Sequence, residues 1–294
     1  MRIGQVAPLN ECVPPSLYGG SERIVSYLTE QLVRLGHEVT LFASGGSQTA
    51  ARLVEVCPRA LWRDPQVREV LPHHVRLLEL VFRDVSQFDV IHFHCDYVHF
   101  PLVRRYKVPT VTTMHGMMHP PDLWQFFEEY REVPLISISN DQRVPIPHGN
   151  WQRTIYHGLP PDLFTFSEEG GHYLAFLGRM SPEKGVDRAI GIARETGVPI
   201  DWPEPFGLVM IEALACGTPV IAWRRGSVPE VLADGLTGYI VESVPEAGNA
   251  VGRLDQLNRC ECRRVFEERF TDERMARDHL RVYERLAKSV GSGA

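Results

Sequence analysis

Two glutamates flank a short turn in the second half of the chain, in the stretch EPFGLVMIE, residues 204–212. Glu204 comes just before the Pro-Phe-Gly turn, and Glu212 lies in the apolar run that follows it. Carboxylates accept hydrogen bonds from ligand hydroxyl groups, and the free N–H groups at a helix start favour an anion. A ligand that carries both hydroxyls and phosphate, such as a nucleotide sugar, fits this combination.

Glu212 is expected inside an enclosed helix, because its neighbours from Leu208 to Leu214 leave almost no polar face. Burying an ionised carboxylate costs several kcal/mol unless it is paired or hydrogen-bonded. The alternative to a ligand role is a structural carboxylate that is satisfied by backbone N–H groups or by an arginine. The position of Glu212 beside the turn favours the ligand role.

Arg179 and Lys184 lie in GRMSPEKG, just after a predicted strand. The chain has only three lysines (Lys107, Lys184 and Lys288) among its 31 basic residues. Spaced across one turn, the two side chains supply about two positive charges to an anion, and a helix N-terminus adds about half a charge. Two solvated basic residues are the alternative. No Asp or His cluster has the spacing of metal ligands, so the expected site uses neither a metal nor another cofactor.

The first half of the chain offers weaker signals. Gly19 and Gly20 follow the first predicted strand, where glycine permits positive φ and close approach of a ligand, although a plain turn is the alternative. His115 ends the strand in TTMHG, at the edge where ligands bind. His92 and His94 alternate on one strand and therefore share a face, which favours a mainly structural role. The chain lacks G-x-G-x-x-G, which disfavours a dinucleotide-dependent dehydrogenase.

The elements that must position these residues alternate between strand and helix. Residues 2–8, 38–44, 88–94, 108–115 and 134–139 are apolar runs typical of buried strands. Residues 21–36 have apolar positions at helical spacing, with Ser21 as the expected N-cap and Gly36 as the stop. This order predicts a parallel, doubly wound α/β sheet.

A second series of elements begins after a linker at 158–171 that is rich in Pro and Gly. We expect strands near 172–180, 218–223 and 237–242, and helices at 184–197, 206–217 and 228–235. The predicted organisation is a Rossmann-like domain at 1–160, a second Rossmann-like domain at 161–270, and a C-terminal helix at 271–294.

Composition narrows the possible classes of function. The 294 residues carry a net charge of −6, which disfavours a nucleic-acid partner or a basic membrane surface. No apolar run approaches the roughly 20 residues of a membrane span, and the first residues lack a signal-peptide core. The six cysteines are scattered through mostly apolar surroundings, which is typical of the reducing cytoplasm.

Seven stretches together resemble the retaining glycosyltransferases of family 4. They are YGGSER, DVIHFH, TMHG and YHGLP for the acceptor half, and GRMSPEKG, EPFGLVMIEALACGTPVIA and GSVPEVLADGLTGYIV for the donor half. The resemblance runs from about residue 2 to about residue 285. It implies the GT-B fold, with two Rossmann-like domains. It also implies metal-independent transfer of a sugar from a nucleoside diphosphate to an acceptor with retention of configuration. The acceptor, whether sugar, lipid or small molecule, is not specified.

The resemblance also implies roles for individual residues. Arg179 and Lys184 would hold the diphosphate, and Glu212 the ribose hydroxyls. Glu204 would hold the sugar hydroxyls. The remaining expected contacts are backbone N–H groups of Phe206, Gly207 and Leu208, the diphosphate against Gly19 and Gly20, and the transferred sugar against His115.

The second domain departs from the family between Gly197 and Glu204, where only VPIDWP precedes the glutamate turn. Family members have strands and helices there, so roughly 60 residues and strands 2 to 4 are absent. The six residues reach about 20 Å, enough to cross the sheet as a replacement strand. Otherwise the outer strands collapse together or leave exposed edges, and Arg179 and Lys184 shift relative to Glu212. The gap therefore predicts that the transferase activity is impaired. The alternative function is a non-catalytic remnant or binding protein that uses the intact first domain.

Overall fold

The computed structural model describes residues 1–106, 108–119, 121–176, 185–198, 200–201 and 208–291. The chain divides into two compact units. Unit 1 comprises Met1–His157 with Asp272–Ala294, and unit 2 comprises Gly158–Thr271. The sequence predicts the first boundary at 160/161, three residues beyond the one that the structure has.

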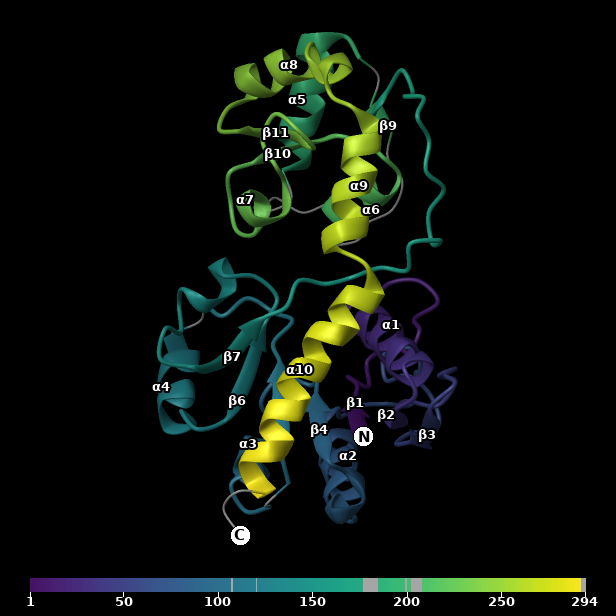
Figure 1. The fold of residues 1–294 in the computed structure, drawn as a ribbon, viewed down its shortest axis with the longest axis vertical. Helices are drawn as coiled ribbons and strands as arrows, with labels where there is room; N and C mark the ends of the chain where they lie inside the picture. The colour runs from purple at the N-terminus through teal and green to yellow at the C-terminus, as the bar shows by residue number, and fades with distance from the viewer. Residues whose placement is uncertain (107, 120, 177–184, 199, 202–207, 292–294) are drawn as a thin grey trace. The chain divides into compact units, whose positions relative to one another are not determined.

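Unit 1 is built on one seven-stranded sheet whose order is β3-β2-β1-β4-β5-β6-β7 (Figure 1). Every neighbouring pair is parallel, as predicted. The strands are β1 (Arg2–Val6), β2 (Glu38–Ala43), β3 (Arg52–Glu55), β4 (Val90–Phe93), β5 (Thr110–Thr113), β6 (Pro134–Ser137) and β7 (Asn150–Thr154). The sequence did not predict β3 and β7, because both mix apolar with polar residues, are only partly buried and lack the continuous apolar run of the central strands.

Helices connect these strands along the chain. They are α1 (Gly20–Arg34), α2 (Leu71–Phe82), α3 (Phe100–Val103) and α4 (Pro121–Glu129), with 3-10 turns η1 (Val85–Gln87) and η2 (Asp141–Arg143). The chain returns to unit 1 after unit 2 with α10 (Asp272–Gly291). The prediction that Ser21 caps α1 is wrong. The helix begins one residue earlier, with Gly19 at the N-cap, because the turn after β1 closes on the glycine and leaves Ser21 within the first turn.

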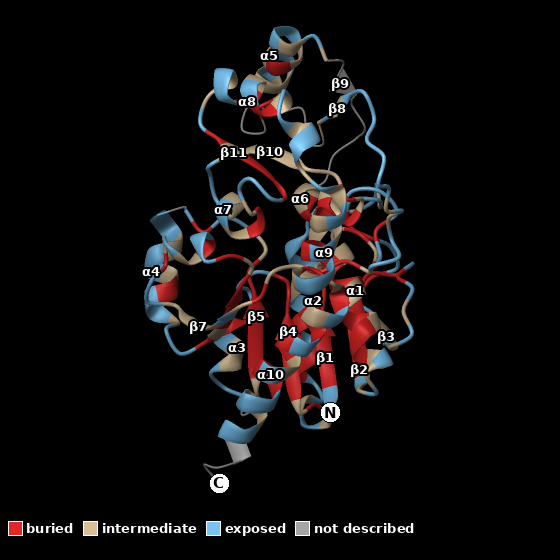
Figure 2. Ribbon diagram, turned by 45° about the horizontal axis from the view of Figure 1, so that its top comes forward, coloured by how far each residue is buried: buried red, intermediate tan, exposed pale blue. Residues whose placement is uncertain are grey.

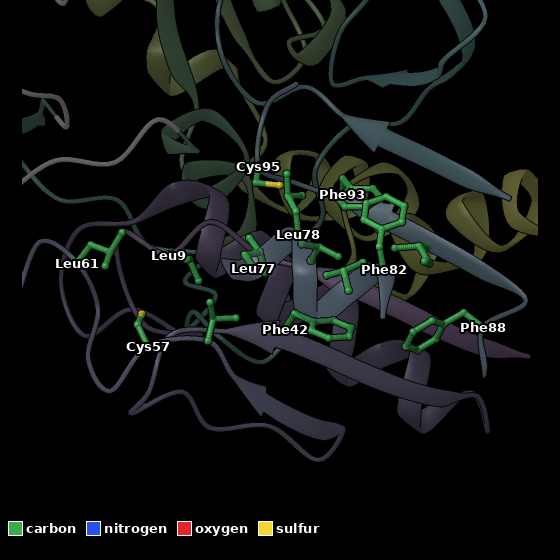
Figure 3. Close-up of a cluster of buried hydrophobic side chains, with 14 residues drawn as sticks. Leu9, Phe42, Cys57, Leu61, Leu77, Leu78, Phe82, Phe88, Phe93 and Cys95 are labelled. Carbon is green, nitrogen blue, oxygen red and sulfur yellow. The ribbon is translucent and has the colours of Figure 1, made fainter. Parts of the chain in front are cut away.

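Buried apolar side chains fill the space between the sheet and its covering helices. The central strands β1, β4 and β5 are almost wholly buried (Figure 2). A large cluster, seen in Figure 3, packs α2 against the sheet through Leu77, Phe82, Phe42 and Phe93. The helix α10 packs beside α1 and β4 (Figure 1). The last helix of the chain therefore belongs to the core of unit 1.

Unit 2 contains two separate two-stranded sheets among its described residues, β8–β9 and β10–β11. Its strands are β8 (Leu174–Ala175), β9 (Ile200–Asp201), β10 (Val220–Trp223) and β11 (Gly238–Val241). Its helices are α5 (Val186–Thr196), α6 (Val209–Ala215), α7 (Val228–Val231), α8 (Val244–Val251), η4 (Leu254–Gln256) and α9 (Arg259–Arg269).

The short connector in VPIDWP does form a strand. Ile200 and Asp201 pair in parallel with Leu174 and Ala175. The connector therefore acts as the replacement strand that its length allows, beside the first strand of the unit. Gly197, with φ of 67°, ends α5 before it, as the sequence predicts.

Candidate functional site

The carboxyl edge of the unit 1 sheet gathers three of the predicted features. Strand order reverses at β1, because β2 lies on one side of it and β4 on the other. Ligands of doubly wound sheets bind at the carboxyl ends of strands, at such a reversal. Gly19 follows β1 through the β1–α1 loop, His94 directly follows β4, and His115 lies two residues after β5.

Gly19 is required by its backbone conformation and by its neighbours. Its φ is +145°, which L side chains rarely adopt. A Cβ placed there would lie 2.8 Å from Cβ of Pro15 and 3.2 Å from a carboxylate oxygen of Glu22. Gly20 is the first residue of α1. The turn therefore presents backbone rather than side chain at the start of this helix.

A buried acidic pair lies beside this turn, and it was not predicted from the sequence. Glu11 and Glu22 are 2% and 5% exposed. Glu22 accepts a hydrogen bond from the backbone N–H of Glu11, and Arg63 pairs with the Glu11 carboxylate at 3.0 Å. Burial raises the pKa of Glu22, although backbone hydrogen bonds oppose the shift. The sequence feature that could have pointed to this pair is Glu22, two residues after Gly20 in GGSE.

His115 belongs to a hydrogen-bonded chain that reaches into the sheet. Its Nε2 lies 2.9 Å from Nδ1 of His94, and Nε2 of His94 lies 2.9 Å from Oε1 of Gln5 in β1. The half-buried ring of His115 also stacks on His157, with centroids 5.4 Å apart. The side chain is thus oriented from two sides.

The same series of hydrogen bonds continues to the helix α10. The amide nitrogen of Gln5 donates to the hydroxyl of Tyr283 at 3.1 Å. That hydroxyl lies 2.6 Å from Nδ1 of His92, whose Nε2 lies 2.7 Å from Oγ1 of Thr113. The rings of His92 and His94 are 4.0 Å apart, so the prediction that they share a face is confirmed.

These histidines are held in the neutral form. Burial, followed by the nearby His279, lowers the pKa of His115 to about 4. Burial also holds the pKa of His92 and His94 well below the ordinary value, and neighbouring imidazoles lower it further. In the described ranges, no group of three or more His, Cys, Asp or Glu residues is arranged to hold a metal ion. The rings here bond to one another and to polar side chains.

Unit 2 holds the predicted donor-binding residues that the structure describes. Leu208 is the N-cap of α6, so its N–H lies at the helix start. The prediction that Glu212 is enclosed is wrong, because the short helix buries Ile211 and Leu214 on one face and leaves Glu212 half-exposed on the other. Arg179, Lys184, Glu204, Phe206 and Gly207 lie outside the described residues.

A hollow on unit 1 lies at the opposite edge of the sheet from His115. Its lining includes Arg2 and Glu38, the first residues of β1 and β2. The ligand edge of a doubly wound sheet is the carboxyl edge. We therefore assign the candidate site to the edge of Gly19 and His115.

Comparison with known proteins gives matches in both halves. Residues 18–144 match Glycosyltransferase Family 4, and residues 176–272 match Glycosyl transferases group 1. By sequence and fold, the chain belongs to the family 4 glycosyltransferases. A probable sucrose-phosphate synthase of Thermosipho melanesiensis is 37% identical over 86 residues, which cover 28% of this chain and 20% of that relative. The chain spans 12% to 31% of the length of eight curated relatives, this one among them.

Solved structures share the GT-B fold of this chain. AviGT4, a glycosyltransferase involved in avilamycin A biosynthesis, superposes with a TM-score of 0.72 at 20% identity, covering 98% of each chain. HepE of Anabaena in complex with UDP-glucose gives a TM-score of 0.66 at 16% identity, covering 99% of this chain and 100% of that one. These similarities concern the fold. Among the described residues, no helix is long and apolar enough to cross a membrane.

Proposed function

We propose that the chain transfers a sugar from a nucleoside-diphosphate sugar to an acceptor, with retention of anomeric configuration. The observation that carries this proposal is the pair of family matches, one over each half of the chain. HepE of the same fold was solved with UDP-glucose. The arrangement of Gly19 and His115 at the carboxyl edge of unit 1 supports a ligand role there.

The proposed chemistry needs the departing diphosphate to be stabilised without a metal. Arg179 and Lys184 bind its charge, and backbone N–H groups at Phe206, Gly207 and Leu208 add partial positive charge. The acceptor hydroxyl attacks from the face that the diphosphate leaves, and a diphosphate oxygen takes its proton. This route retains configuration and needs no enzymic carboxylate pair around the anomeric carbon.

Hydroxyl groups of the donor are held by residues of different chemistry. Glu212 accepts hydrogen bonds from the ribose, and Glu204 from the transferred sugar. His115 contacts the same sugar, and Gly19 and Gly20 approach the diphosphate through backbone. A carboxylate that accepts from two adjacent hydroxyls orients the ligand as well as binding it.

We infer that activity is impaired by the shortened unit 2. Each described strand of this unit has a single hydrogen-bonded partner, and catalytic geometry tolerates misplacement of only about 1 Å before large losses in rate. The proposed setting is the cytoplasm, because all six cysteines are free. The acceptor is a sugar, lipid or small molecule rather than a nucleic acid, given the net charge of −6.

Isothermal titration calorimetry with UDP, GDP and ADP tests donor binding first. We expect saturable heat with one of them, followed by hydrolysis of the corresponding sugar nucleotide. Proton NMR of the released sugar then reports its configuration before mutarotation, and an α-linked donor should release the α anomer. The absence of heat with any nucleotide at millimolar concentration would refute donor binding and leave a binding protein that acts through unit 1.

The role of His115 is tested by a matched pair of variants. His115→Ala should lower kcat/KM about tenfold, the loss expected for one hydrogen bond to a ligand. His119→Ala is the control, because His119 is exposed four residues further along the same loop. Equal rates for the two variants would remove His115 from the site.

A further inference from the structure

The hydrogen bonds around His115 have a direction, and the amide of Gln5 defines it. The amide nitrogen of Gln5 donates to the Tyr283 hydroxyl, and the amide oxygen faces Nε2 of His94. An amide oxygen can only accept. Nε2 of His94 therefore carries the proton, and because a neutral imidazole has one donor and one acceptor, Nδ1 of His94 is an acceptor.

The direction passes from His94 to His115. Within the described part of the chain, Nδ1 of His94 has Nε2 of His115, 2.9 Å away, as its single partner. Because Nδ1 of His94 accepts, Nε2 of His115 must be the donor. The second nitrogen of His115, Nδ1, is then unprotonated and acts as an acceptor. Among the described residues, no hydrogen-bond partner occupies this Nδ1.

The hydrogen bonds on the other side of Gln5, through Tyr283 and His92 to Thr113, fit the same donor and acceptor assignment. Because the Tyr283 hydroxyl accepts from Gln5, its own proton is free to donate to Nδ1 of His92. Nε2 of His92 is then the protonated nitrogen and donates to Oγ1 of Thr113. Every nitrogen and oxygen in this half has a partner. Burial raises the pKa of Tyr283, so its proton remains in place.

The Gln5 side chain joins the two parts of the hydrogen-bonded chain, so the donor and acceptor roles in both parts depend on it. It is completely buried in β1, with its side chain on the same face as His92, its neighbour in β4. His94 is 3% exposed. The opposite polarity would require the Gln5 amide to turn over and every ring to exchange its protonated nitrogen together. One amide therefore controls the protonated nitrogen of His115.

We propose that Gln5 and His94 are positioning residues that hold His115 as the Nε2–H tautomer, with Nδ1 as the acceptor for a sugar hydroxyl of the donor. This rests on the proposed function, since the hydroxyl belongs to the nucleotide sugar. The selectivity that follows is for a group that donates a hydrogen bond. A deoxy or O-methyl sugar at that position cannot satisfy Nδ1 and binds less tightly.

The test is the tautomer of His115 in protein labelled with ¹⁵N-histidine, read from two-bond ¹⁵N–¹H correlations at pH 7. Comparison with His115→Asn assigns the resonances. Wild-type protein should show a protonated Nε2 and an unprotonated Nδ1 on His115. Gln5→Leu removes the amide, so both nitrogens of His115 should move to intermediate shifts as the two tautomers mix.

Gln31→Leu is the matched control. Gln31 is also buried, and its amide nitrogen also bonds to α10, at 2.7 Å from Oδ2 of Asp272, but among the described residues its side chain has no hydrogen bond to a histidine. It should leave the His115 pattern unchanged. If Gln5→Leu does not fold, Tyr283→Phe removes only the hydroxyl that orients the amide and should mix the tautomers in part.

Two results would overturn the proposal: a wild-type His115 protonated at Nδ1, or variants at Gln5 and Tyr283 that keep the wild-type pattern. In an active enzyme, Gln5→Leu should also lower kcat/KM about two- to tenfold, whereas Gln31→Leu should not. The tautomer is measured without substrate. A protein that binds no nucleotide would thus refute the proposed function and leave the tautomer result standing.

Discussion

The strands of unit 1 and unit 2 differ in how many neighbours they have. In unit 1, β1 bonds to β2 on one side and to β4 on the other, and the sheet extends over seven strands. In the described part of unit 2, β10 bonds only to β11, and β8 only to β9. A strand with two neighbours is fixed in register along both edges, whereas a strand with one exposes an edge.

This difference determines how firmly each unit can position a side chain. The chain from Gln5 to His94 and His115 crosses three adjacent strands, so its 2.9 Å contacts depend on their common register. In unit 2, support comes instead from helix packing, α5 against α8 and α6 against α9. A shortened sheet can thus retain its motif helices and lose the rigidity that catalysis requires.

The two units should differ most in their response to acid. Unit 2 has one histidine, the exposed His172. Unit 1 has seven whose pKa is lowered by burial first: His37, His92, His94, His99, His115, His157 and His279.

Histidines in an unfolded chain have a pKa of about 6.5, so below that pH the unfolded state binds protons that folded unit 1 does not. The stability that these neutral histidines contribute to unit 1 is therefore fully present above about pH 6.5 and is lost as the pH falls towards 4. His279 alone, with its pKa lowered to about 4, accounts for up to about 3 kcal/mol. The buried carboxyls Glu22 and Asp272, whose pKa is raised by burial, oppose this trend.

Hydrogen exchange corrected for intrinsic rates, followed by mass spectrometry between pH 7 and 4.5, should show protection lost from unit 1 before unit 2. His279→Leu removes one titrating group and should flatten the pH dependence of unit 1. Loss of protection from unit 2 first would contradict the expected order.

Two matched variants that each create a cavity test how the cores of unit 1 and unit 2 respond to lost packing. Leu77 in α2 and Leu214 in α6 are both completely buried. Truncation of either to alanine should cost about 2 to 5 kcal/mol, depending on how far the surroundings relax into the cavity. Hydrogen exchange should show the loss from Leu77→Ala in the strands of unit 1 and that from Leu214→Ala in α6 and α9. A loss spread equally over both units would show that they unfold together.

Lys184→Ala tests whether unit 2 supplies catalytic charge. We expect kcat to fall on the order of 10²-fold or more, because the variant removes charge stabilisation from the leaving diphosphate. Lys288→Ala is the control, since Lys288 is exposed near the end of α10. An unchanged rate for Lys184→Ala would refute its assigned role.

The smallest expected effect concerns a helix cap in unit 2. The Ser243 side chain accepts a hydrogen bond from the backbone N–H of Glu246 at the start of α8. Ser243→Ala should lower the free energy of unfolding by about 1 kcal/mol in urea titrations. Ser227→Ala is the control, because Ser227 precedes α7 without a side-chain cap and should change stability by less than about 0.5 kcal/mol.

Local patterns in the sequence predicted the parallel sheet and the helix stops at Gly36 and Gly197, and they allowed a replacement strand in the connector, where Ile200 and Asp201 pair with β8. Each of these follows from nearby residues: apolar runs, positive-φ glycines and the reach of an extended chain. Ser21 and Glu212 show the limit. Ser21 is a favourable capping residue, but the turn closes on Gly19, which takes the N-cap position of α1. Glu212 is half-exposed because only one face of the apolar helix α6 is covered.

The sequence by itself determined the family motifs, the apolar strands of the unit 1 sheet, and the position of His115 at a strand end. Only the tertiary structure brought Gln5, His94 and Tyr283 into one hydrogen-bonded chain with it. The physical reason is that these bonds join residues up to 278 positions apart. They form where β1, β4, β5 and α10 meet, and no spacing within a single segment can encode such a meeting.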